Sequence, residues 1–269
     1  MKVISWNVGR SYKNIDNQLS ILKEDPDIMC LQEVTQKSFN IFKKKLNKKF
    51  NYISFSLDLI PDKNLLIGPR RLGVLIASKY KTELRKITEF ELPWRERVLN
   101  LNIYNKKKIK FYGVYIPPGS SNKWIKIETL EGLFRGLSKK NNSPTIMCGD
   151  FNIPQEENTK GVITFAQKIQ KNNEIITKKS FRGGSGFRWD AAERSIFENN
   201  GLYDLFDCYR NLHPNKKEYS FYIERKNKIV AKRGFDHFFC SKLKPIKVKY
   251  LHSYREKKFS DHSPMLMEL

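Results

Sequence analysis

Two short polar clusters in this chain carry residues that could hydrolyse a phosphate ester. One is Gly-Asp-Phe-Asn at 149–152, and the other is Ser-Asp-His-Ser-Pro at 260–264. Each lies beside a short apolar run, 144–148 or 265–269, that we expect to form a buried strand. Carboxylates, an amide and an imidazole at strand ends can hold a divalent cation, activate water and face the negative charge that develops on phosphorus. The clusters therefore predict metal-assisted hydrolysis of a phosphodiester.

Four further clusters have the same property, a polar residue that ends or adjoins an apolar strand. Sheet ends are where a rigid scaffold can gather side chains from distant parts of a chain. We therefore expect all six clusters to meet at one site. The four are Trp6-Asn7 and the segments 31–33 (LQE), 115–117 (YIP) and 235–237 (FDH).

The elements that must position these clusters are mostly strands. Strand patterns often follow one another directly, as they do between 73 and 115. A strict alternation of strand and helix is therefore excluded, and the pattern favours two mixed sheets packed face to face with helices outside. We expect strands at 3–6, 28–32, 51–55, 73–77, 98–104, 109–115, 145–148, 235–240, 246–251 and 264–269, and helices at 17–24, 36–46, 122–137, 161–171 and 191–199.

The composition indicates a globular and strongly basic protein. The apolar fraction of 39% is ample for a core in a chain of 269 residues. Lys and Arg number 51 against 28 acidic residues, a formal charge of +23, and a field of that sign concentrates polyanions. Nucleic acid is the partner that this charge favours. The alternative is a composition set by genome bias, with lysines that only solvate helix faces.

The location that we expect is intracellular, either cytoplasmic or with the nucleoid or nucleus. A strand pattern begins at Lys2, which leaves no room for a signal peptide before it. No stretch of the sequence approaches the roughly 20 consecutive apolar residues that a membrane span requires, so we expect no membrane partner. The four cysteines are scattered without a CxxC pair, which favours reduced core thiols over zinc ligands or disulfides.

One long irregular stretch, 178–189, interleaves glycines with Phe, Arg and Trp. Guanidinium groups pair with phosphates, rings stack on bases, and glycines let a backbone approach closely, so the stretch could contact nucleic acid. The alternative is a flexible crossing loop.

Taken in order along the chain, the clusters closely resemble the endonuclease/exonuclease/phosphatase superfamily, which includes DNase I, exonuclease III and the abasic-site endonucleases. The resemblance rests on WN, PDIxxLQE at 26–33, YxP, GDFN and a final SDHxP, and it covers essentially the whole chain. It implies a single domain over 1–269, a four-layer α/β/β/α sandwich, and we expect a monomer.

The resemblance makes Glu33 the principal ligand of Mg²⁺, with Asn7 beside it and Asp261 as a further contributor. Hard oxygen ligands with open water positions suit Mg²⁺ or Mn²⁺ and argue against zinc. It makes Asp150 the group that activates or orients water, and Asn152 a hydrogen-bond donor to the phosphoryl oxygen. The alternative for Glu33 is an exposed carboxylate at a strand end without a metal. The alternative for Asp150 and Asn152 is that they only shape a turn.

The resemblance also assigns a histidine. His262 is expected to face the scissile phosphate, with Asp236 accepting a proton from its other ring nitrogen and raising its pKa, so that the ring is cationic. His237 follows Asp236 on the same strand and is expected to point to the opposite face with a structural role.

Tyr115 separates branches of the superfamily. Members that resemble exonuclease III, the abasic-site endonucleases and the retroelement endonucleases carry Tyr-x-Pro here, whereas DNase I and many lipid or inositol phosphatases carry His. Tyr115 therefore favours a nuclease and is expected to contact the phosphate; the alternative is a core tyrosine.

Three departures leave the substrate undecided. Pro118 stands where repair enzymes usually have Asn, Gly9 stands where they often have Asp or Asn, and the run 232–235 (KRGF) differs from their usual pattern. Several cations and one tryptophan are candidates for substrate contacts, against the alternatives of surface charge and core packing. They are Arg70, Arg71, Arg97, Arg182, Arg188, Trp189 and Arg233.

The leading hypothesis is a Mg²⁺-dependent DNA endonuclease or exonuclease, including the abasic-site repair type, that leaves a 3′-hydroxyl and a 5′-phosphate. One rival keeps the chemistry on RNA, a tyrosyl-DNA adduct or another phosphodiester. A rival of another class is an inactive nucleic-acid-binding module.

Overall fold

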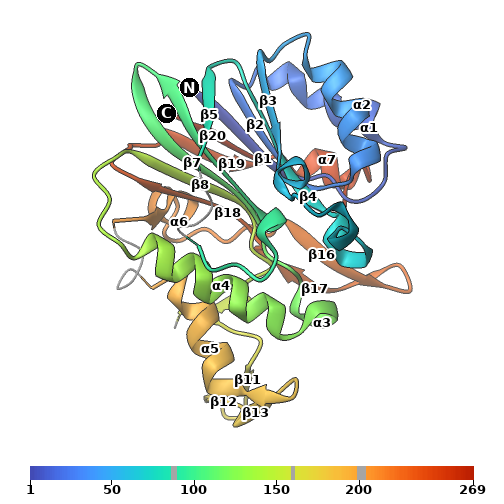
Figure 1. Cartoon of the computed structure of the whole chain (residues 1–269). Coiled ribbons are helices and arrows are strands. Elements are labelled where there is room, and N and C mark those ends of the chain that lie inside the picture. Colours follow the sequence, from blue (N-terminus) through green and yellow to red (C-terminus); the bar gives the residue numbers. More distant parts are fainter. Residues whose placement is uncertain (86–89, 159–160, 199–203) are drawn as a thin grey trace.

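The computed structural model describes residues 1–85, 90–158, 161–198 and 204–269. Within these residues two six-stranded mixed sheets pack face to face, and helices cover both outer faces (Figure 1). The predicted four-layer α/β/β/α sandwich is confirmed.

The first sheet has the strand order β19-β20-β1-β2-β4-β3. β1 and β2 run parallel, so both end at the same edge, with Asn7 opposite Gln32. The strands are β19 (Lys247–Tyr250), β20 (Met265–Glu268), β1 (Lys2–Asn7), β2 (Ile28–Val34), β4 (Gly73–Ser78) and β3 (Tyr52–Phe55).

The second sheet has the order β15-β18-β8-β7-β6-β5. β7 and β8 are parallel, with Tyr115 opposite Asp150, and β18 runs antiparallel to β8, with Asp236 opposite Asp150. Three polar strand termini therefore lie side by side. The strands are β15 (Phe206–Asp207), β18 (Asp236–Ser241), β8 (Thr145–Asp150), β7 (Lys107–Tyr115), β6 (Val98–Asn105) and β5 (Lys81–Leu84).

The central strands carry apolar residues on both faces because both faces are buried. In β1, Val3 belongs to the core between the two sheets, whereas Ile4 packs beneath the helices of the first sheet. In β8, Ile146 faces the inter-sheet core and Met147 the helices of the second sheet. Strands buried on both sides read as continuous apolar runs, which is why they could be predicted.

Helices α1, α2 and α7 cover the first sheet, and α4 and α5 cover the second (Figure 1). α2 begins after Thr35, whose Oγ1 accepts a hydrogen bond from the Ser38 backbone N–H. The helices are α1 (Ile15–Leu19), α2 (Gln36–Leu46), α3 (Gly119–Asn122), α4 (Trp124–Leu137), α5 (Gly186–Ser195), α6 (Cys208–Leu212) and α7 (His252–Glu256). Short 3₁₀ helices lie at Ser20–Glu24, Ser56–Leu59, Lys63–Leu65, Gly68–Arg71 and Arg95–Arg97.

The segment between β8 and β15 differs most from expectation. The predicted helix at 161–171 is wrong, because this segment contributes strands to two small hairpins that pair with residues outside it. The stretch 178–189 is not irregular but contains a hairpin and the start of α5, which Ser185 caps. Asn199, the end of the last predicted helix, lies outside the described residues. The strands are β9 (Glu156–Asn158), β10 (Gly161–Ile163), β11 (Gln167–Ile169), β12 (Ile175–Thr177), β13 (Ser180–Phe181) and β14 (Gly184–Ser185).

A hairpin that the sequence patterns did not indicate precedes β18. It consists of β16 (Phe221–Arg225) and β17 (Lys228–Arg233), and Phe221 forms an isolated bridge with His262. None of the described helices has the length and apolar character to cross a membrane.

Candidate active site

Side chains from five strand termini and from the segment before β20 converge at one edge of the sandwich. Asn7 links the two sheets, because its Nδ2 donates to Asp150 Oδ2 at 2.9 Å and to Glu33 Oε1 at 3.3 Å. Ser260 Oγ donates to the Asn7 carbonyl oxygen at 2.6 Å, which ties the C-terminal cluster to β1. The sequence clusters, which lie far apart along the chain, therefore form one site.

Glu33 occupies an irregular position in β2. The register of β2 against β4 shifts between Leu31 and Val34, and Glu33 has a left-handed φ of 60°. A bulge of this kind re-aims a side chain. Glu33 Oε1 accepts a hydrogen bond from the Tyr115 hydroxyl at 2.8 Å, while Oε2 faces Arg10 Nε at 3.5 Å. The Glu33 side chain is 16% exposed, so solvent can reach it.

Asp150 is buried at the end of β8. Its Oδ1 accepts from the Asn152 backbone N–H at 2.8 Å, and its Oδ2 accepts from Asn152 Nδ2 at 3.1 Å. Gly149 precedes it with a φ of 150°, and a Cβ there would lie 1.8 Å from the Val114 carbonyl oxygen, so only glycine fits. Asn152 itself has a left-handed φ of 53°. The GDFN segment is thus a constrained turn that aims a carboxylate and an amide at one point.

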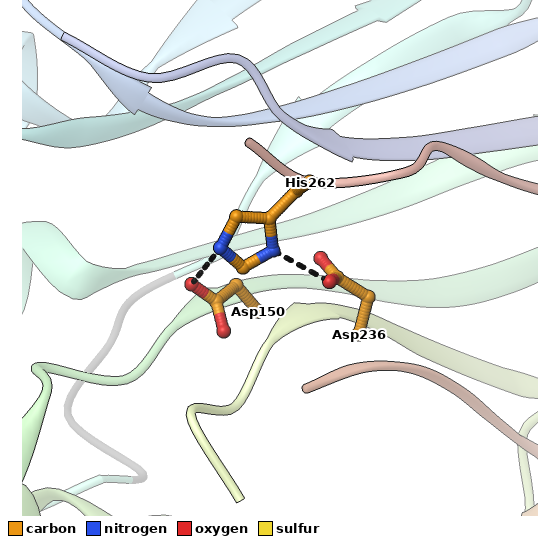
Figure 2. A group of neighbouring side chains, drawn as sticks. All are labelled: Asp150, Asp236 and His262. Atoms are coloured by element: carbon orange, nitrogen blue, oxygen red, sulfur yellow. Dashed lines mark hydrogen bonds and ion pairs between the residues drawn. The ribbon is translucent and has the colours of Figure 1, made fainter. Parts of the chain in front are cut away.

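His262 lies between two buried carboxylates (Figure 2). Its Nδ1 is 2.7 Å from Asp236 Oδ2, and its Nε2 is 3.9 Å from Asp150 Oδ2. Trp6 fixes the backbone there, because its Nε1 donates to the His262 carbonyl oxygen at 2.9 Å.

Burial and neighbouring charges have opposite effects on the pKa values of His262 and Asp150. Burial lowers the pKa of His262, but the negative charges of Asp236 and Asp150 outweigh burial and raise this pKa to about 10. Burial, opposed by the positive His262, raises the pKa of Asp150 to about 7. At neutral pH the imidazole is therefore a cation, and Asp150 can accept or hold a proton.

The ligand atoms of Asp150, Asp236 and His262 lie within 4.8 Å of one another, close enough to hold a metal ion. A doubly protonated imidazole, however, has no lone pair to offer a metal. The Glu33 carboxylate is therefore the better donor, and His262 remains a positive charge beside Asp150.

Two residues expected at the metal have other contacts. Asn7 turns its amide nitrogen toward both carboxylates, while its Oδ1 accepts from the Gly9 backbone N–H at 3.0 Å. In this arrangement Asn7 acts as a hydrogen-bond donor that orients the carboxylates. Asp261 is exposed and accepts from Ser260 Oγ at 3.4 Å, and its charge helps to raise the pKa of His262.

Tyr115 is buried, and burial raises the pKa of its hydroxyl well above the usual range, so this hydroxyl is a donor at neutral pH. The Arg97 guanidinium lies 4.4 Å from the centre of the Tyr115 ring, and its Nη2 donates to the Pro69 carbonyl oxygen at 2.7 Å. Arg97 is only 1% exposed. The expectation of a direct substrate contact is therefore corrected: Arg97 supports Tyr115 from below.

Trp189 requires the same correction. Its side chain is fully buried, and the rings of Trp124 and Phe181 pack against it in T-shaped geometry. Its Nε1 donates to Glu193 Oε1 at 2.8 Å. Trp189 is a core residue.

The remaining substrate candidates are scattered and mostly engaged. Arg70 forms a two-bond ion pair with Glu96, and the exposed Arg188 forms one with Glu131. Arg182 donates to the Gly119 carbonyl oxygen. The other two are Arg71, which is exposed, and Arg233, which is half-buried.

The sequence patterns missed a cavity of about 230 Å³ beside Asn152. Aromatic rings from separate elements form much of its wall, and Phe221 and Phe235 stack on each other there. Arg182 and the buried Lys126 also line it. Local patterns marked Asn152, Pro118, Arg182, Trp189 and the KRGF run separately, but not the cavity, because its residues meet only in the folded chain.

His237, the neighbour of Asp236, points to the opposite face of β18. Its Nδ1 is 2.9 Å from Asp207 Oδ2, and its Nε2 is 2.9 Å from the Ile153 carbonyl oxygen. Both ring nitrogens are engaged in the interior, as expected of a structural histidine.

Comparisons with known proteins agree with this architecture. A DNA-(apurinic or apyrimidinic site) endonuclease of Dictyostelium discoideum is 29% identical over 280 aligned residues, covering 98% of this chain and 69% of the relative. An AP endonuclease from Archaeoglobus fulgidus has the same fold, with a TM-score of 0.68 and 20% identity over 100% of this chain and 99% of that one. A 3′ phosphatase from Neisseria bound to a product DNA hairpin superposes with a TM-score of 0.62 and 18% identity over 100% and 99% of the two chains.

The sequence profile of the Endonuclease/Exonuclease/phosphatase family matches residues 4–262. That span runs from β1 to His262 and includes all the strand-end clusters described above except the last residues of the SDHSP segment. The chain therefore belongs to the Endonuclease/Exonuclease/phosphatase family.

Proposed function

We propose that this protein is a Mg²⁺-dependent DNA phosphodiesterase that hydrolyses P–O bonds, with abasic-site DNA as its principal substrate. The observation that carries the proposal is the buried cluster of Asp150, His262 and Asp236 beside the solvent-reachable Glu33. The similarity to a relative named as an abasic-site endonuclease supports the choice of DNA. The net charge of +23 favours a polyanionic substrate.

The donor set fits a hard divalent cation. Among the described residues, Glu33 Oε2 pairs with Arg10 Nε at 3.5 Å, and solvent reaches the side chain. Asn7 links Glu33 to the Asp150 carboxylate, which is assigned the role of base. Oxygen ligands with room for water suit Mg²⁺ or Mn²⁺. When bound, such a cation would polarise the phosphoryl oxygen and make water more acidic.

The protein residues have distinct roles in the proposed reaction. Asp150, with its pKa near 7, accepts the proton of the attacking water. His262, held cationic by Asp236, faces the charge that grows on the phosphoryl oxygens. The amide of Asn152 donates to Asp150 and the hydroxyl of Tyr115 donates to Glu33, and we assign both as donors to the phosphoryl oxygens once substrate is bound. Water attacks phosphorus in line with the leaving 3′-oxygen, which leaves a 3′-hydroxyl and a 5′-phosphate.

The test is a panel of labelled substrates with Mg²⁺: duplex DNA with an abasic-site analogue, intact duplex and single-stranded RNA. We expect cleavage of the abasic duplex to be fastest, to stop with EDTA and to return with added Mg²⁺ or Mn²⁺. Glu33→Gln removes a charge from the metal donors and is expected to raise the Mg²⁺ concentration needed for half-maximal rate. Arg194→Met on α5 serves as a control far from these donors.

Three results would overturn parts of this proposal. Cleavage that persists in EDTA would contradict metal dependence. Faster cleavage of RNA than of both DNA substrates would instead favour the RNA hypothesis. Pro118, which stands where repair enzymes usually have Asn, lines the cavity and leaves this hypothesis open. Tight salt-dependent DNA binding without turnover in either metal would indicate a binding module.

We further propose that the chain acts inside the cell as a monomer formed by one catalytic domain. The inter-sheet core, which draws on strands from both ends of the chain, supports a single domain. Sedimentation equilibrium would test the monomer, and a concentration-dependent dimer would contradict it.

A further inference from the structure

A buried lysine on α4 contacts the catalytic turn from behind. Lys126 is 1% exposed, and its Nζ donates to the Asn152 carbonyl oxygen at 3.0 Å and to Glu193 Oε1 at 2.5 Å. Burial of a charge is costly, and a buried ion pair often adds little net stability. A structural gain alone therefore does not explain why an ammonium lies here.

Glu193, on α5, holds the ammonium in one place. Its Oε1 also accepts from Trp189 Nε1 at 2.8 Å, and its Oε2 accepts from the Phe165 backbone N–H at 2.8 Å. The carboxylate is itself fully buried. With both oxygens engaged, Glu193 has little freedom, and neither has the lysine paired with it.

Asn152 needs such support. Its left-handed φ of 53° is unfavourable for a residue with a side chain. Its backbone N–H is bonded to Asp150, and its Nδ2 donates to the Ile116 carbonyl oxygen at 2.9 Å. Lys126 provides the partner of its carbonyl oxygen. Without that partner, the turn could relax and rotate the Asn152 amide away from the site.

The same ammonium lies at the wall of the 230 Å³ cavity, which Asn152, Phe165 and Trp189 also line. Lys126, which extends from α4, therefore contacts the turn at 149–152 and lines the cavity.

We propose that Lys126, held by Glu193, is a positioning residue that fixes the orientation of the Asn152 amide for the transition state. The inference rests on the proposed hydrolysis of DNA. Because Lys126 acts through Asn152 and not on the substrate, its loss lowers turnover and leaves substrate affinity nearly unchanged.

The first test is the double substitution Lys126→Met with Glu193→Gln, which removes both charges and leaves no unpaired ion in the interior. We expect kcat on abasic duplex to fall roughly 100-fold, as for a misplaced catalytic group, with KM nearly unchanged. The control is Arg194→Met with Asp190→Asn, which removes a half-buried ion pair from the same helix. It is expected to leave both constants unchanged.

A thermodynamic cycle with Asn152→Ala sharpens the test. If Lys126 acts through the Asn152 side chain, the double substitution costs little further activity once that side chain is absent. Equal losses in the two backgrounds, or a parent-like kcat in the double variant, would overturn the proposal. Lys126→Arg keeps a cationic donor and is expected to restore most of kcat; a loss as large as that of the double variant at equal stability would also contradict it.

A measurement without turnover keeps the two proposals separate. The side-chain amide resonances of Asn152, identified by their absence in Asn152→Ala, are expected to shift or broaden in the double variant of the metal-free protein. Unchanged resonances would overturn the positioning role. If the parent cleaves no substrate of the panel, the proposed function fails, while these resonances still decide whether Lys126 orders Asn152.

Discussion

Two aspartate–histidine pairs start from neighbouring residues of β18 and point to opposite faces. Asp236 reaches His262 at the site with a separation of 2.7 Å. His237 reaches Asp207 in the interior with a separation of 2.9 Å. The residue types and the distances are nearly the same, but the surroundings of the two pairs differ.

The two pairs differ in the charge of the third group that each one contacts. The pair that we propose to be catalytic faces another carboxylate, Asp150, whose pKa burial raises to about 7. The interior pair faces Arg210, which donates to Asp207 Oδ2 at 2.6 Å and to Glu157. Although burial raises the pKa of Asp207, Arg210 and His237 lower it to about 2 overall. One cluster can exchange a proton near neutral pH, and the other is fixed in its charged form.

The largest expected effect comes from Asp150→Asn. An amide cannot accept the proton of water, so we expect kcat to fall roughly 1,000-fold. The urea midpoint is expected to stay or to rise, because one of two like charges near His262 is removed. Single-turnover cleavage and urea unfolding measure both quantities. Parent-like cleavage by this variant would remove Asp150 from the mechanism.

The interior pair is expected to respond in the opposite way. Asp207→Asn removes the buried carboxylate that Arg210 and His237 share, whereas Arg210 keeps Glu157. We therefore expect a loss of about 3 kcal/mol of unfolding free energy, the low end for a broken buried pair. The kcat of the folded protein should change little. Asp236→Asn is the matched substitution, and we expect it to reduce kcat strongly and stability less. The reverse pattern would show that the two pairs have been assigned the wrong way round.

Acid should weaken the fold through Asp207. Its folded pKa of about 2 is below its ordinary value of 3.8, so its contribution is complete above that value and is lost as the pH falls toward 2. The contribution is about 2 kcal/mol. Unfolding free energies of the parent and of Asp207→Asn, measured between pH 2 and 6, are expected to converge at the acid end. Parallel curves would exclude this linkage.

The pH dependence of kcat is expected to follow the protonation of Asp150. The deprotonated form of Asp150 is the base, so kcat is expected to rise about tenfold per pH unit below pH 7 and then to level off. It should decline again only when His262 loses its proton, near pH 10. A pH profile of single-turnover rates tests both limbs, and a flat profile from pH 5 to 8 would argue against this base.

Most of the site could be predicted because each functional residue adjoins a strand that is buried on both faces. Asn7 and Asp150 follow continuous apolar runs, and parallel strand pairing brings such ends to one edge. The role of Asn7 as a donor could not be predicted, since the orientation of its amide depends on the Gly9 N–H and on two distant carboxylates.

Prediction from the sequence failed where the role of a residue depends on a partner far away along the chain. Lys126 reads as an ordinary helix lysine, and only Glu193, 67 residues away, explains its burial. Trp189 resembles a stacking residue beside arginines, yet α5 begins at Gly186 and turns the ring into the core. The apolar residues of 161–171 suit a helix, but their pairing with 156–158 and 175–177 forms strands instead.

The most direct test of the central claim is hydrolysis of abasic duplex in water enriched in ¹⁸O with Mg²⁺. In-line attack of water on phosphorus predicts ¹⁸O in the 5′-phosphate of the product and none in the 3′-hydroxyl, with no product from Asp150→Asn at the same time point. A 5′-phosphate without ¹⁸O, or an unsaturated sugar at the 3′ end, would show cleavage by elimination and contradict the account.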